Sequence, residues 1–140
     1  MTDIFNYNRR KSSTVKAGNC LIGGDNPIRL QSMTTTNTND TEASVEQAIR
    51  IIKAGGELVR LTTQGTREAL NMGNIRYALR CRGYSVPLVA DVHFNANVAD
   101  VAAEHCDKVR INPGNYTDPA RKIRHIEYTD EEHAAEQHKI

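Results

Sequence analysis

The sequence predicts an α/β fold in which parallel strands alternate with helices. Short apolar runs rich in β-branched residues recur along the chain, for example at residues 58–62, 86–92 and 109–112. Between them lie segments with apolar residues at helical spacing. Polar residues follow the far end of each apolar run. Strands that alternate with helices imply parallel pairing through right-handed crossovers.

The composition is that of a globular protein. The chain has 140 residues, of which 39% are hydrophobic and 25% charged, and its formal net charge is +1. This suits one domain with a sizeable core, and gives no support for nucleic-acid or membrane partners. No segment resembles a signal peptide or a membrane span.

The three cysteines are expected to be small buried residues. Cys20, Cys81 and Cys106 are too far apart for the spacing of a zinc or iron–sulfur site, so no metal site is predicted in this chain. An odd, sparse count favours a reducing cytosol over a disulfide scaffold.

The N-terminal segment, residues 1–26, is predicted to contain a β-hairpin. Two short apolar pieces within residues 15–22 flank Gly18 and Asn19, a typical hairpin signal. The first strand of the main domain is then expected at residues 28–33.

Three segments have the periodicity of amphipathic helices. The first begins near Asp40 or Thr41, either of which could cap it, and ends before Gly55. The second covers residues 66–82, and the third follows a cap at Asn95. The residues predicted to face inward are Val45, Ala48, Ile49, Ile52, Ala69, Met72, Ile75, Leu79, Val98, Val101 and Ala102.

Strands at residues 58–62, 87–92 and 109–112 complete the order βαβαβαβ, and the polar tail from Asp118 onward is predicted to begin another helix. Two architectures fit: an open doubly wound sheet, or part of a TIM (β/α)₈ barrel. No Gly-x-Gly-x-x-Gly follows the first strand and no Gly-x-x-x-x-Gly-Lys-Ser/Thr occurs, which disfavours the nucleotide-binding open sheets.

A complete barrel needs about 250 residues. On the barrel interpretation, residues 27–140 are the N-terminal part, about four of the eight βα units, and the hairpin plugs the amino end.

Polar side chains at the predicted strand ends form the candidate site. Residues two apart on a strand share a face, and ligands of parallel α/β folds bind at the carboxyl ends. Two arginines there would suit a phosphate or diphosphate, and His93 beside Asp91 could donate a hydrogen bond or act as a general acid. The candidates are Arg60, Thr62, Asp91, His93, Arg110 and Asn112.

Plainer interpretations exist for five of the six candidates. Either arginine could simply pair with a neighbouring carboxylate, and Asp91 could orient a loop or cap a helix. His93 could be a structural hydrogen-bonding residue, and residues 112–115 (NPGN) could form an ordinary turn. The other histidines are expected to be solvated or packed: His105, His125, His133 and His138.

At these residues the chain resembles the family of 4-hydroxy-3-methylbut-2-en-1-yl diphosphate synthases (GcpE, also called IspG). The matching segments follow the family's order over nearly the whole chain. Residues 61–65 (LTTQG) are similar to its longer, three-domain form. The matching segments include residues 10–12 (RKS), 18–19 (GN), 31–34 (QSMT), 58–60 (LVR), 86–94 (VPLVADVHF) and 109–115 (VRINPGN).

The resemblance implies an oxidoreductase of the methylerythritol phosphate route to isoprenoids. It would reduce 2-C-methyl-D-erythritol 2,4-cyclodiphosphate to (E)-4-hydroxy-3-methylbut-2-enyl diphosphate, with electrons from ferredoxin or flavodoxin passing through a [4Fe–4S] cluster. The barrel would hold the diphosphate, with Arg60, His93, Arg110 and Asn112 at substrate-contacting positions and Asp91 nearby as a catalytic candidate alongside His93.

One feature departs from the complete family pattern. None of the three cysteines matches the cluster ligands, so the iron–sulfur domain is expected to be absent and these residues alone inactive. We expect a bacterial cytoplasmic protein whose first half-barrel self-associates through open strand edges. Two alternatives are a non-catalytic half-barrel module that binds phosphate or another anion, and a pterin-synthase-like barrel enzyme.

Overall fold

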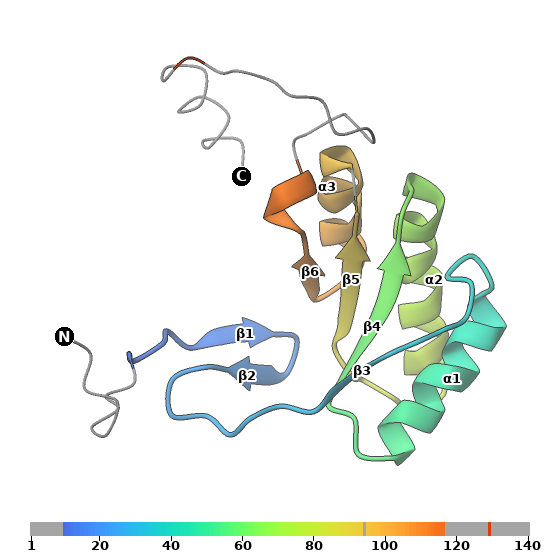
Figure 1. Ribbon diagram of the computed structural model, residues 1–140. Coiled ribbons are helices and arrows are strands. Elements are labelled where there is room, and N and C mark those ends of the chain that lie inside the picture. Colours follow the sequence, from blue (N-terminus) through green and yellow to red (C-terminus); the bar gives the residue numbers. More distant parts are fainter. Residues whose placement is uncertain (1–9, 94, 117–128, 130–140) are drawn as a thin grey trace.

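The computed structural model describes residues 10–93, 95–116 and 129. A hairpin of β1 (Val15–Ala17) and β2 (Cys20–Ile22) precedes a four-stranded parallel sheet in the order β3-β4-β5-β6 (Figure 1). The strands of this sheet are β3 (Gln31–Met33), β4 (Leu58–Thr63), β5 (Leu88–Val92) and β6 (Lys108–Arg110). The connecting helices are α1 (Thr41–Lys53), α2 (Thr66–Cys81) and α3 (Ala96–His105), and a 3₁₀ turn, η1 (Pro113–Asn115), follows β6.

The helices pack against one face of the sheet. Val59 and Leu61 of β4 and Leu88 and Ala90 of β5 belong to one buried cluster with the inner sides of α1, α2 and α3. A doubly wound sheet has helices on both faces, whereas a barrel has them only outside. The sequential strand order and one-sided helices confirm the predicted barrel segment of about four βα units.

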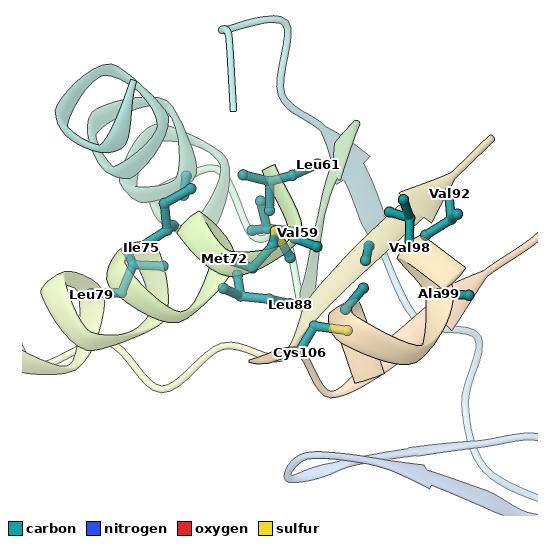
Figure 2. Close-up of a cluster of buried hydrophobic side chains, with 14 of the residues drawn as sticks. Val59, Leu61, Met72, Ile75, Leu79, Leu88, Val92, Val98, Ala99 and Cys106 are labelled. Atoms are coloured by element: carbon teal, nitrogen blue, oxygen red, sulfur yellow. The ribbon is translucent and has the colours of Figure 1, made fainter. Parts of the chain in front are cut away.

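The central helix supplies much of this core. Ala69, Met72, Ile75 and Leu79 of α2 are all at most 2% exposed, as their spacing predicts. Figure 2 shows Met72, Ile75 and Leu79 among the buried side chains. Three other predicted core residues, Ile49, Ile52 and Val101, are only half-buried and lie at the margin of the cluster. Ala99, which the prediction omits, is buried in α3.

Local signals explain where the helices begin and end. The Asp40 side chain accepts a hydrogen bond from the Ala43 amide at 3.1 Å, and Asn95 caps α3 through the Asn97 amide at the same distance. Gly55, with φ of +97°, follows α1 because few other residues adopt that conformation readily. None of the described helices has the length and apolar character needed to cross a bilayer.

Two sequence predictions are wrong in detail. The first strand covers only Gln31–Met33, and Ile28 is 92% exposed, because β3 pairs with β4 alone and no described strand covers its outer edge. Cys81 is exposed rather than buried because it lies on the last turn of α2, whereas Cys20 and Cys106 are buried. The helix predicted from residue 118, with His125, His133 and His138, lies outside the described residues.

The hairpin covers the amino-terminal half of the sheet's other face. Ala17 and Cys20 are buried against Leu58 and Val89, the first inward-facing residues of β4 and β5. The turn is tight: a Cβ atom added to Gly18 would lie 3.1 Å from the Pro87 side chain. The hairpin therefore occupies the place expected of a plug, and the carboxyl ends of the strands are left for a site.

Glu57 joins the hairpin side of the molecule to β3. Its Oε1 lies 2.8 Å from Nη1 of Arg29, and its Oε2 accepts a hydrogen bond from the Leu30 amide at 2.9 Å. Arg29 also donates from Nε to the carbonyl of Leu21 in β2. The Leu30 amide and then the Arg29 guanidinium lower the pKa of Glu57 below its ordinary value of 4.5.

Replacing this carboxylate should alter how thermal stability depends on pH. Because the folded-state pKa is lowered, the stabilisation is fully present above the unfolded-state pKa and is lost as pH falls through the folded-state value. Between about pH 6 and pH 3, the Tm of the wild type should therefore fall more than that of Glu57→Gln. Glu104→Gln, at an exposed position on α3, is the matched control, and a pH profile unchanged by Glu57→Gln would contradict this role.

Candidate functional site

Strand alternation places the candidate residues on the face opposite the helices. On β4, Val59 and Leu61 enter the helix-side core, so Arg60 and Thr62 face the other way. Thr62 is in register with Asp91 on β5, which is in register with Arg110 on β6. The parallel register therefore brings together side chains that are up to 50 positions apart in the sequence.

Asp91 is the centre of this group. It is only 2% exposed. Its Oδ1 lies 3.0 Å from Nη1 of Arg110, and its Oδ2 lies 3.4 Å from Nε of Arg60 and 3.3 Å from Nε2 of His93. We call these four residues the Asp91 cluster.

The charges of the Asp91 cluster suit an anion. Burying an isolated carboxylate is expensive, and the two guanidiniums compensate it. One negative group then faces two permanently positive ones, so the cluster has a net positive charge. Side chains of Arg60, Arg110 and His93 remain 31%, 41% and 28% exposed, so each can contact both Asp91 and a ligand at the surface.

Arg60 is also held from the opposite side. Its Nε and Nη2 lie 3.4 and 3.3 Å from the sulfur of Met33 on β3. A thioether is a weak, polarisable acceptor that competes little with an oxyanion. Met33 and Asp91 therefore fix the orientation of this guanidinium, and the position of Met33 at the end of the first predicted strand did not indicate this contact.

Asn112 lies just beyond the end of β6, at the start of the turn that follows it. The strand predicted at residues 109–112 ends at Arg110, and the Asn112 side-chain oxygen accepts a hydrogen bond from the Gly114 amide at 3.2 Å. This contact caps η1, as in the turn interpretation. The pairing interpretation of the arginines also matches the geometry, since both contact Asp91, but their exposure leaves them able to bind a ligand as well.

A polar cavity of about 500 Å³ lies beside the cluster, between the loop after β3 and the start of α2. Thr62 lines it, and the Thr38 hydroxyl donates to the Thr62 carbonyl at 2.6 Å. Asn39 Nδ2 donates to Glu68 Oε1 at 2.6 Å across the same region. The only signal of this cavity in the sequence is the polar run at residues 34–41. The side of the cavity formed by α2 depends on how that helix packs, which the sequence pattern does not indicate.

The described residues offer no site for a metal. They contain no group of three or more histidine, cysteine or acidic side chains that could hold an ion. Cys20 and Cys106 are buried in different clusters and Cys81 is exposed. The iron–sulfur cluster implied by the resemblance therefore does not fit this part of the chain.

Comparison with known proteins gives a consistent set of similarities. The sequence profile described as "GcpE TIM-barrel domain" matches residues 12–137. The chain is 66% identical over 138 residues to a protein of Phocaeicola vulgatus, and 64% identical over 138 residues to one of Bacteroides fragilis. Both are named 4-hydroxy-3-methylbut-2-en-1-yl diphosphate synthase (flavodoxin). The alignments cover 99% of this chain but only 22% of each relative, so the chain spans about a fifth of their length.

Neutralising Asp91 should destabilise the fold. In Asp91→Asn, an amide without negative charge would face the donors of Arg60 and Arg110, at a cost of about 1–3 kcal/mol in the free energy of unfolding. Urea denaturation measures this loss. Asp100→Asn, at an exposed position on α3, should change stability by less than about 0.5 kcal/mol. Equal stability of the two variants would contradict the proposed charge balance.

Proposed function

This chain belongs to the GcpE TIM-barrel family, and we propose that it forms the first half of the substrate-binding barrel of a 4-hydroxy-3-methylbut-2-en-1-yl diphosphate synthase. The proposed substrate is 2-C-methyl-D-erythritol 2,4-cyclodiphosphate, and the proposed product is (E)-4-hydroxy-3-methylbut-2-enyl diphosphate. The observation that carries the proposal is the Asp91 cluster, which brings together Arg60 of β4, His93 directly after β5 and Arg110 of β6 around one buried carboxylate.

The chemistry of the cluster supports a diphosphate ligand. Guanidinium groups form paired, charge-assisted hydrogen bonds with phosphate oxygens. In this proposal Arg60 and Arg110 bind the diphosphate from two strands, while the buried carboxylate behind them holds both side chains in place. Asn112 uses its side-chain oxygen to cap η1, and we assign its amide nitrogen the role of a donor to the substrate.

His93 is the proposed proton donor or hydrogen-bond donor to the substrate. Its Nε2 faces Asp91 at 3.3 Å, a contact that orients the ring, and 28% of the side chain is exposed. Asp91 is almost fully buried and already contacts three cationic or donor groups, so we assign it to positioning rather than to proton transfer.

The reduction requires an electron donor. The relatives' printed name includes flavodoxin, and we propose flavodoxin, in preference to ferredoxin, as the electron donor of the whole protein. We further propose that the [4Fe–4S] ligands lie on another part of a longer polypeptide in the bacterial cytoplasm. On this proposal residues 1–26 are the hairpin segment and residues 27–140 the first half of the barrel.

Substitution of Arg110 tests the assignment of the substrate. In the whole protein, Arg110→Ala should weaken binding of the cyclodiphosphate about 10- to 150-fold, because a charged hydrogen bond to the anion is lost. Calorimetric titration gives the Kd, and turnover gives kcat/KM. Arg50→Ala, on the exposed side of α1, is the control. Unchanged Kd and kcat/KM in Arg110→Ala would refute the assignment.

The same titration separates the proposal from its alternatives. A non-catalytic anion-binding module would lose affinity for phosphate in Arg110→Ala without ever turning over the cyclodiphosphate. The reading frame beyond Ile140 offers a second discriminator, since further strand–helix units followed by a Cys-rich segment favour the synthase. A pterin-synthase-like enzyme would instead turn over a pterin substrate.

The half-barrel expressed alone should self-associate. The outer edges of β3 and β6 have no strand partner among the described residues, and Leu30, just before β3, is 61% exposed. Unpaired edges invite pairing with another chain, and a lysine there opposes it. Sedimentation velocity of residues 1–140 should show a weight that rises with concentration, and Leu30→Lys should reduce the rise. A concentration-independent monomer would contradict this expectation.

A further inference from the structure

A second pair of arginines lies at the opposite end of the sheet from the Asp91 cluster. Arg76 and Arg80, one turn apart on α2, line a cavity of about 210 Å³ together with the hairpin turn and the segment before β5. The Asp107 side chain, just before β6, forms another part of the wall. The cavity lies at the amino ends of β5 and β6, so we call it the amino-end pocket.

The positive charge of the amino-end pocket is poorly neutralised. The Arg80 guanidinium makes no hydrogen bond or ion pair within the part of the chain that the structure describes, and Arg76 donates only to the Glu104 carbonyl, at 3.3 Å. Residues four apart on a helix are neighbours, so these like charges repel each other. The one carboxylate in the lining, Asp107, accepts a hydrogen bond at Oδ2 from the Leu88 amide at 3.0 Å.

Neutral donors complete the lining. Asn19 from the hairpin turn and Tyr84 and Ser85 from the loop before β5 also line the pocket, and their side chains carry an amide and two hydroxyl groups. Leu79 of α2, which also lines the pocket, is 2% exposed. Two guanidiniums with amide and hydroxyl donors form the set of groups that recognises an oxyanion.

We propose that the amino-end pocket binds a small oxyanion, either inorganic phosphate or the phosphate group of a small metabolite. Pockets for drug-sized ligands occupy about 300–1,000 Å³. The amino-end pocket is smaller, at about 210 Å³, so it suits a phosphate group rather than a large ligand. Five steps of extended chain, from Val86 at the pocket to Asp91, separate it from the Asp91 cluster by roughly 15 Å, so the two sites can be occupied independently.

Phosphate binding to the whole protein tests the proposal, with Arg110→Ala as the background that weakens binding at the Asp91 cluster. In that background, calorimetric titration should detect a phosphate site that Arg80→Gln weakens about tenfold, because one charged donor is lost. Arg67→Gln, at an exposed position on the first turn of the same helix, should leave the affinity unchanged. Arg80 is exposed, so its replacement should leave the Tm unchanged.

Three outcomes would overturn the proposal. They are an absence of phosphate binding in the Arg110→Ala background, an unchanged affinity in Arg80→Gln, and an equal loss in Arg67→Gln. Arg80→Gln alone should bind the cyclodiphosphate as the wild type does, so failure of this proposal remains distinguishable from failure of the proposed function. Competition by glycerol 3-phosphate, compared with inorganic phosphate, then separates a phosphorylated metabolite from the free ion.

Discussion

The buried carboxylate of Asp91 is the constraint on which the rest of the site depends. A carboxylate that is 2% exposed requires compensation, and the parallel register supplies it from both neighbouring strands, through Arg60 and Arg110. The ion pairs with Asp91 also order the side chains of Arg60 and Arg110. Two long, flexible side chains that would otherwise sample many rotamers are held near one geometry before any ligand arrives, which reduces the entropic cost of binding an anion.

The same sheet face is divided along the strands. On β4 and β5 the apolar Leu58 and Val89, which are buried beneath the hairpin, are each followed on the same face by a charged residue, Arg60 and Asp91. Because side chains alternate along β4 and β5, the helix-side residues pack in a separate core. The opposite face can therefore change from apolar to charged along the strands without disturbing the packing of the helices. The same two strands therefore supply both the apolar residues under the hairpin and the charged residues of the Asp91 cluster.

The polar loop after β3 extends the site beyond the strands. Thr38 donates a hydrogen bond to the Thr62 carbonyl, and Asn39 donates one to the Glu68 side chain. These two hydrogen bonds connect the loop to β4 and α2. The resulting cavity borders the register row of Thr62, Asp91 and Arg110. A ligand held by the cluster would therefore have hydroxyl and amide groups on one side.

The sequence by itself determined the elements and the chemistry of the strand ends. Spacing alone identifies Met72 and Ile75 as core residues and places Asp91 and His93 on one face, because helix and strand periods are local properties. Only the tertiary structure decided that Asp91 is the shared partner of both arginines, that Met33 supports Arg60, and that Asn112 caps η1. Those facts depend on strand register and on chain direction after β6, which arise from contacts between residues distant in sequence.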